Sequence, residues 1–423
     1  MNSLFFSFCL LLVTSSVHTK VAGAAWLLAA LMGLLAWSRG RFCHNAQPNA
    51  QPLQTDGATQ AARIWAIAAL AALILKAIPM LYWGSSWDER HAEIRLLIGA
   101  IGIYGMSYMF LPARALSWLA IALGVASVLA TALIGLYGPN STPTNRIPWA
   151  SGVSLLTLAA LGIAWLCNGW QRIALIAASL FGAMGIVFLS QVRGAMPIAV
   201  AWIILQISLS LTTKENQGHR LDLKKCRAAT IAGLWVAAAC LLIGISTFYT
   251  PASKRIILAK EEVIAFATNE AGNQNTSVGV RLHMWSEALP IIASNLTWGV
   301  GKEARLTHIH QWGQQLKSPT IQSLGHVHNE YLQTLLEHGL WGLASFLSYT
   351  LGMLLAARSL WRAHIKIPAL TLGSIAAMHS VAEITNMNFA HNYYPTLLSL
   401  SVTVTLIAAM LTRLSQGDRV KTI

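Results

Sequence analysis

Apolar segments close to twenty residues long recur along almost the whole chain, and this recurrence restricts the fold more than any other feature. A helix needs about 20 apolar residues to cross the hydrocarbon core of a bilayer, because it rises about 1.5 Å per residue. Charged residues make up only 10% of the chain, against about 25% in soluble domains. The sequence therefore predicts an all-α, polytopic membrane protein. Twelve spans are predicted, at residues 4–17, 21–37, 64–83, 94–111, 116–137, 151–167, 173–189, 197–211, 228–248, 339–357, 369–385 and 394–411.

Basic residues are distributed unevenly between the loops on the two sides of this predicted bundle. If the first helix starts in the cytoplasm, the cytoplasmic loops and C-terminal tail carry sixteen Lys and Arg, and the short loops opposite carry five. An excess of basic residues marks the cytoplasmic side of a membrane protein, so both termini are predicted to be cytoplasmic. The net charge of +14 has the same explanation, because no Lys/Arg run resembles a nucleic-acid footprint. The bilayer is an expected partner and nucleic acid is not.

The longest segment between predicted spans then lies outside the cytoplasm. We predict three parts: residues 1–249 with helices one to nine, residues 250–338 as an outer helical loop domain, and residues 339–423 with three helices and a cytoplasmic tail. Apolar residues recur at helical spacing at 253–270, 280–295 and 329–342, which favours a small helical cap. In the last of these stretches, Leu332, Leu335, Leu336 and Leu340 are expected on one stripe.

Three histidines and two glutamates occur in one stretch, GHVHNEYLQTLLEHGLWG at residues 325–342. Imidazoles exchange protons near neutral pH, so His328 and His338 are candidate proton acceptors. Ten residues of a straight helix rise about 15 Å. The two side chains therefore cannot act on one atom unless the helix breaks between them.

Two arginines are candidate anion ligands on the same outer side. Arg193 lies between two apolar spans, where a charge is costly and indicates a function, although snorkelling to the interface is the alternative. Arg281 begins an amphipathic helix and is otherwise an ordinary exposed arginine. Two such residues can hold phosphate oxygens through bidentate, charge-assisted hydrogen bonds. Lys76 can add a point charge, but we expect it to snorkel.

Other polar patterns give weaker predictions. His379 and Glu383 are four residues apart near the outer end of a span, where they either pair structurally or line a cavity. The pairs His308-x-His310 and His326-x-His328 resemble metal ligands, but zinc needs three or four ligands in a fixed geometry. We therefore predict no metal, and a surface cluster for the first pair. No phosphate-binding loop and no serine hydrolase motif occurs, and Gly299-Val300-Gly301 is predicted to be a turn.

Three motifs resemble those of bacterial O-antigen ligases, within the wider O-antigen ligase/polymerase superfamily. They are SQVRGA at residues 190–195, VGVRLHMWSEAL with WGVG at 278–301, and His328-Asn329 followed by Gly339-x-x-Gly342. The resemblance implies a GT-C-like, membrane-embedded, inverting glycosyltransferase that uses no metal, cofactor or ATP. Its donor would be a glycan on undecaprenyl pyrophosphate. Its acceptor would be a sugar hydroxyl of lipid A–core oligosaccharide at the periplasmic face of the bacterial inner membrane.

The resemblance also implies roles for individual residues. Arg193 and Arg281 would bind the pyrophosphate, and His328, which matches the motif histidine, would be the base, with His338 the second choice. Supporting roles would fall to Lys76, Asn329, His379 and Glu383. The alternatives are an O-antigen polymerase, a protein O-oligosaccharyltransferase and, from another class, a flippase for lipid-linked sugars. Ionisable residues gather at the outer interface rather than at the midplane, which favours an enzyme over a transporter.

Overall fold

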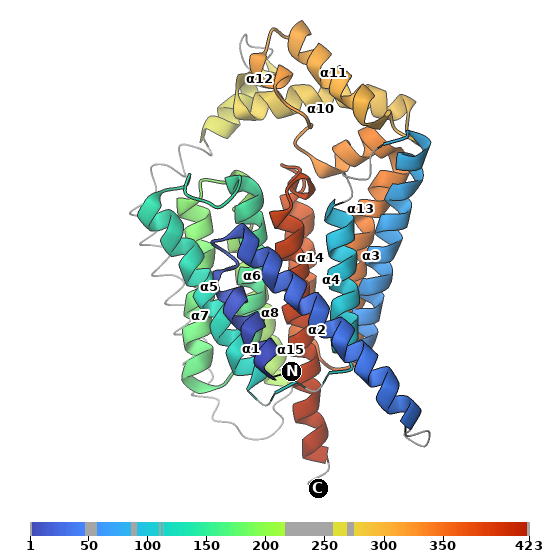
Figure 1. The fold of residues 1–423 in the computed structure, drawn as a ribbon. Helices are drawn as coiled ribbons and strands as arrows, with labels where there is room; N and C mark the ends of the chain where they lie inside the picture. The colour runs from blue at the N-terminus through green and yellow to red at the C-terminus, as the bar shows by residue number, and fades with distance from the viewer. Residues whose placement is uncertain are drawn as a thin grey trace.

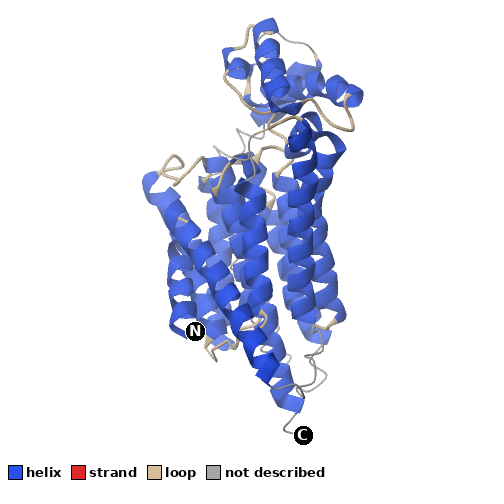
Figure 2. Cartoon of the chain, turned by 45° about the vertical axis from the view of Figure 1, so that its right-hand side comes forward, coloured by secondary structure: helices blue, strands red, loops and turns tan. Residues whose placement is uncertain are grey.

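The computed structural model describes residues 2–46, 57–85, 91–109, 111–112, 114–215, 257–268 and 275–420. Every regular element within these residues is helical, which confirms the all-α prediction for this part of the chain. A bundle forms most of the molecule, and a smaller helical cap covers one end of it (Figures 1 and 2). The bundle contains α1 (Asn2–Thr14), α2 (Thr19–Ala46), α3 (Gly57–Tyr82), α4 (His91–Met106), α5 (Ala115–Tyr137), α6 (Arg146–Ala164), α7 (Gly169–Met184), α8 (Ile198–Glu215), α13 (Glu330–Arg362), α14 (Lys366–Ala382) and α15 (Tyr393–Val420).

Eight helices of the described residues are long and apolar enough to cross a membrane. Each coincides with one of the twelve predicted spans. Three more predictions correspond to α1, α4 and α14, which have fewer than eighteen residues and fall below that length. The predicted span at 228–248 lies outside the described residues. The chain is therefore a polytopic helical membrane protein.

Small residues allow α6 to occupy the centre of the bundle. A Cβ added to Gly162 would lie 2.0 Å from the Thr371 side chain of α14, and one added to Gly152 would lie 2.8 Å from Leu397 of α15. Such close approach of helices is the common means of packing in membranes, where the hydrophobic effect does not drive helices together. Almost all of α6 and the apolar part of α15 are consequently buried.

The cap contains helical residues 257–267, α10 (Ser277–Ser294), α11 (Gly301–Gln315) and α12 (Pro319–Gln322). It has an apolar core separate from that of the bundle. This core consists of Val280, Met284, Ala288, Ile292, Ile309, Trp312, Ile321, Val327 and Leu336. Both chain ends lie toward the opposite end of the molecule (Figure 1).

Helix α13 joins the cap to the bundle and breaks at Gly339, where φ is 62° and ψ is −149°. The turn before α11 fills the break: Val300 N donates to Leu336 O, and Leu340 N donates to Leu296 O, both at 2.8 Å. The main chains are in direct contact here, so there is no room for a side chain: a Cβ on Gly339 would lie 2.4 Å from the Thr297 carbonyl. We call these paired main-chain segments, 296–300 and 336–340, the glycine seam.

The glycine seam corrects one prediction. The four leucines of 332–340 were expected on one stripe, but the break turns Leu340 away, and it is 48% exposed. Leu336 is fully buried in the cap core, and Leu332 and Leu335 pack against that core. The predicted turn at Gly299-Val300-Gly301 has positive φ at both glycines, as only glycine adopts readily.

Candidate active site

Arg193 projects from an interruption between two helices. Helix α7 ends in a π-helical turn, Gly185–Leu189, and a 3-10 turn at Arg193–Ala195 precedes α8. Between them Gln191 has a φ of 57°, and Ser190 Oγ accepts a hydrogen bond from Val192 N at 3.2 Å. The side chain of Arg193 is 28% exposed. It is held by this broken segment at the cap end of the bundle, rather than lying along a continuous helix.

Arg281 approaches Arg193 from the cap. Its Nη1 donates to the carbonyl and hydroxyl oxygens of Ser277, one turn earlier in α10. Glu262 connects the two arginines: its Oε2 accepts from Val278 N at 2.8 Å and lies 3.8 Å from Arg193 Nη1. Burial and the charge of Arg193 lower the pKa of Arg281, which shows that the two cations are neighbours.

His328 lies in the loop before α13, with a φ of 56°. The backbone on either side of it is fixed by side chains. Trp285 Nε1 donates to Val327 O at 2.8 Å, and Asn329 Oδ1 accepts from Leu332 N at 3.1 Å as the N-cap of α13. The tryptophan of the arginine–tryptophan motif therefore holds the loop that carries the motif histidine.

The imidazole of His328 is neutral at pH 7. Burial and the charge of Arg281 lower its pKa to about 4. The ring of His326 lies 4.3 Å from that of His328, and burial followed by the charges of His328 and His391 lowers the pKa of His326 to about 3. A neutral imidazole near Arg281 can accept a proton while Arg281 and its neighbour Arg193 hold an anion.

We call Arg193, Arg281 and His328 the open cluster, because neither arginine has a carboxylate of the described residues within hydrogen-bonding distance. Within the described part of the chain, Arg193 Nη1 and Arg281 Nε are buried without a hydrogen-bond partner. The Glu262 carboxylate is 3.8 Å from Arg193 Nη1, longer than a direct hydrogen bond. This arrangement can accept oxygens of an anionic ligand.

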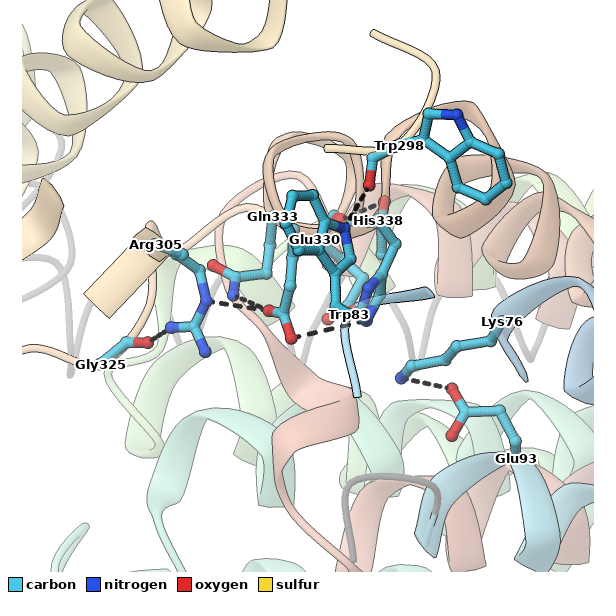
Figure 3. A network of polar contacts seen from close by, with 11 residues as sticks. Lys76, Trp83, Glu93, Trp298, Arg305, Gly325, Glu330, Gln333 and His338 are labelled. Atoms are coloured by element: carbon cyan, nitrogen blue, oxygen red, sulfur yellow. Dashed lines mark hydrogen bonds and ion pairs between the residues drawn. The ribbon is translucent and has the colours of Figure 1, made fainter. Parts of the chain in front are cut away.

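His338 belongs to a second group, which we call the closed cluster: Arg305, Gln333, Glu337 and His338. Glu337 Oε2 lies 2.8 Å from Arg305 Nε and accepts from Gln333 Nε2 at 2.9 Å, and Glu337 Oε1 lies 3.5 Å from His338 Nε2. Arg305 also donates to Gly325 O. The side chain of His338 is 3% exposed. The charged groups that act on it are those of this cluster and of Lys76 and Glu93 (Figure 3), whereas Arg281 acts on His328, so the two candidate bases have different charged neighbours.

Lys76 does not snorkel, and that prediction was wrong. Its Nζ forms a 2.7 Å ion pair with Glu93 of α4, and its side chain is 16% exposed. Figure 3 shows this pair on the opposite side of Gln333 and His338 from Arg305. A buried lysine needs a nearby counter-charge, which α4 supplies in place of the membrane interface.

His379 and Glu383 form a structural pair, one of the two alternatives. Both side chains are fully buried, with His379 Nδ1 3.7 Å from Glu383 Oε1. His379 Nδ1 is also 2.9 Å from the Tyr394 hydroxyl. Glu383 Oε2 accepts from Asn388 N at 3.1 Å, so the pair fixes the segment that follows α14.

Histidines of the cap make ordinary contacts. His308 stacks on Trp312, with 6.1 Å between ring centroids, and His310 Nε2 lies 3.0 Å from Gln314 Nε2. Among the described residues, no three His, Cys, Asp or Glu side chains lie together in a way that can hold a metal ion.

Sequence reasoning missed Arg305, Glu93 and Asn386. Arg305 lies on a helix rich in polar residues, where its burial to 6% exposure depends on packing against α13. Asn386 lies three residues after Glu383, the C-cap of the apolar helix that contains His379, and its Oδ1 lies 3.4 Å from His328 Nδ1. Two asparagines in ITNMNF, at a predicted membrane boundary, were the available signal.

Comparisons with known proteins support the resemblance to O-antigen ligases. Residues 175–347 match a family model described as O-antigen ligase, and this segment contains both arginines and both candidate bases. A protein of Haemophilus influenzae, described as uncharacterized, is 32% identical over 91 residues. That match covers 21% of this chain and 22% of the relative, so the chain spans about a fifth of the relative it matches. The segment at 175–347 is therefore similar to the O-antigen ligase family, and it contains the three motifs that carry the predicted resemblance.

Proposed function

We propose that the chain is an O-antigen ligase, which transfers polysaccharide from undecaprenyl pyrophosphate to a sugar hydroxyl of lipid A–core oligosaccharide. The observation that carries the proposal is the open cluster. Arg193, Arg281 and His328 come from three separate segments of the chain, and Arg281 lies near each of the other two where the cap joins the bundle. Two incompletely bonded cations beside a neutral base suit a reaction that expels a pyrophosphate and removes a hydroxyl proton.

In the proposed reaction, the acceptor hydroxyl oxygen attacks the anomeric carbon of the donor sugar. The bond between this carbon and the pyrophosphate oxygen breaks on the opposite side, so the configuration inverts. His328 Nε2 takes the hydroxyl proton, and undecaprenyl pyrophosphate leaves with the bonding electron pair. Arg193 and Arg281 stabilise the charge that builds on the leaving oxygens, and such electrostatic stabilisation commonly contributes more to catalysis than any other effect.

The closed cluster supports a role for His328 rather than His338 as the base. The ring of His338 is buried beside Glu337, on a helix whose neighbouring backbone is paired in the glycine seam. A substrate hydroxyl would have to displace these groups to reach it. His328 lies beside Arg281 and is only partly buried.

We further propose that the cap faces the periplasm and that both chain ends are cytoplasmic. The distribution of sixteen basic residues against five supports this orientation. The positions of both chain ends, away from the cap, agree with it (Figure 1). The donor pyrophosphate would then meet the open cluster at the membrane surface, with its polyprenyl chain in the bilayer.

The test is transfer by purified protein in detergent with EDTA present. Undecaprenyl-pyrophosphate glycan is supplied with or without lipid A–core, and products are separated on gels. A glycan-shifted lipid A–core band, absent with Arg193→Ala and Arg281→Ala, is expected. Arg146→Ala, at the start of α6, is the control that keeps transfer.

Other products would identify a different protein. Longer lipid-linked glycans in place of the shifted band would mean an O-antigen polymerase. Glycan joined to a protein acceptor would mean a protein O-oligosaccharyltransferase. Movement of the donor across proteoliposomes without any new bond would mean a flippase.

A further inference from the structure

We infer that Asn386 is a positioning residue that keeps the His328 proton on Nδ1 and so leaves the Nε2 lone pair free to accept a proton. The inference rests on the proposed role of His328 as the base. It concerns the segment between α14 and α15, to which the motifs assign nothing. A base must present a lone pair toward the hydroxyl, and a neutral imidazole has one on only one of its two nitrogens.

A chain of hydrogen bonds fixes which way the Asn386 amide faces. Asn388 Nδ2 donates to Ala382 O at 3.5 Å, which leaves Asn388 Oδ1 as an acceptor on the other side of its amide. Asn386 Nδ2 donates to this oxygen at 2.8 Å. The oxygen of Asn386 therefore faces His328.

An amide oxygen only accepts, so the facing nitrogen of His328 must donate. Asn386 Oδ1 lies 3.4 Å from His328 Nδ1, and an N–H on Nδ1 is the only arrangement that gives a hydrogen bond there. The distance is long for a hydrogen bond, as is common in catalytic sites without substrate. The proton on Nδ1 places the lone pair on Nε2.

The segment that carries Asn386 is rigidly held. Asn386 is 4% exposed, and Asn388 and Glu383 are fully buried. Glu383 Oε2 accepts from Asn388 N at 3.1 Å, and its backbone carbonyl accepts from Glu330 N at 2.9 Å. The second of these bonds ties the end of α14 to the start of α13, two residues after His328. The positions of Asn386 and the His328 ring relative to each other are therefore fixed by the end of α14 and by the start of α13.

The first measurement is the tautomer of His328 in protein labelled with ¹⁵N-histidine, in detergent and without substrate. The His328 signals are identified by their loss in His328→Gln. Wild type is expected to show a protonated Nδ1. Asn386→Leu, which lacks the acceptor, is expected to show a large fraction of the Nε2-protonated form. Asn392→Ala, at an exposed asparagine six residues later, is the control and is expected to keep the wild-type signals.

The second measurement is kcat against pH. Asn386→Leu is expected to lower kcat about 10-fold to 100-fold, the range typical when a group that orients a functional histidine is removed, with little change in KM. Asn386→Asp still accepts from Nδ1 and adds a negative charge. It is expected to restore much of the activity and to move the acidic limb of the profile to higher pH.

Several charged groups contribute to the same pH profile. Arg281 faces His328 from α10, His326 faces it from the same loop, His391 and Arg305 act on His326, and Glu383 lies behind Asn388. The difference between Asn386→Asp and wild type isolates the contribution at Nδ1, because these other groups are unchanged.

An unchanged tautomer in folded Asn386→Leu would overturn the inference. If that variant does not fold, Asn386→Asp decides: an acidic limb identical to that of wild type would overturn it. The tautomer measurement needs no turnover. If Asn386→Leu changes the tautomer but neither wild type nor any variant transfers glycan, the proposed function is rejected and the inference is kept. If wild type transfers glycan but Asn386→Leu leaves the tautomer unchanged, the inference is rejected and the proposed function is kept.

Discussion

The open and closed clusters lie at the same junction and use the same kinds of side chain, yet their charges are balanced differently. In the closed cluster, Arg305 meets the carboxylate of Glu337 at 2.8 Å, and Gln333 bonds to the same oxygen. In the open cluster, two arginines share one carboxylate, which is 3.8 Å from Arg193. A balanced buried pair holds the cap to α13, whereas unbalanced cations remain available to a ligand. Charge balance, rather than residue type, distinguishes the two roles.

The largest expected effect separates the two histidines. His328→Gln should lower kcat by about 10²–10⁴-fold, the usual contribution of a general base, with an unchanged melting temperature at neutral pH. His338→Gln should keep most of the activity. Initial rates of glycan transfer and thermal unfolding in detergent measure both. A loss confined to His338→Gln, in a folded protein, would move the base into the closed cluster.

The second prediction compares Arg305 of the closed cluster with Arg281 of the open cluster by their contributions to the free energy of unfolding. Arg305→Ala should destabilise the fold by about 3–5 kcal/mol, because it leaves the Glu337 carboxylate buried without its cation. Arg305→Met with Glu337→Gln should recover most of this loss, since no charge is left unpaired. Thermal unfolding of both variants, with Arg281→Ala as the control, measures it. Equal destabilisation by Arg281→Ala would remove the distinction between the clusters.

The third prediction concerns pH. The pKa of His328 is about 4 in the folded protein against 6.5 for a free histidine, so the unfolded chain binds more protons between these values. Stability should therefore fall as the pH is lowered from about 6.5 to about 4. The melting temperature of His328→Gln should depend less steeply on pH over this range. A steeper dependence in this variant would contradict the depressed pKa.

The smallest expected effect comes from a change at Glu262, the carboxylate between the two arginines. Glu262→Gln removes the negative charge near Arg193 but keeps an oxygen to accept from Val278 N. Without this charge the donor no longer competes with Glu262 for Arg193, so the donor KM should decrease. The decrease should be only a few-fold, because a partly exposed ion pair contributes less than about 1 kcal/mol of interaction free energy. Glu261→Gln, an exposed neighbour, is the control. An increase in donor KM would mean that Glu262 orders Arg193 rather than competing with the donor.

The sequence predicted the helices well because apolar length is a local property. It also selected Arg193, Arg281 and His328, since an arginine between spans and a histidine motif are visible without knowing what packs beside them. The break at Gly339 was not predicted, because it depends on main-chain bonds to residues about forty positions earlier. Lys76 and Glu93 were not paired for the same reason: each is near a helix end, and only the packing of α3 against α4 brings them together.

The glycine seam joins the cap to α13 through main-chain atoms, beside the buried side-chain pair of Arg305 and Glu337. Its hydrogen bonds join main-chain atoms of 296–300 to those of 336–340, and its requirements are glycine at 299 and 339. Side chains on the exposed faces of α10 and α11 take no part in this attachment. Exposed residues of the cap can therefore be altered one at a time while Arg281, on α10, keeps its position relative to Arg193 in the bundle. The attachment of the cap and the chemistry of its outer surface can therefore change independently.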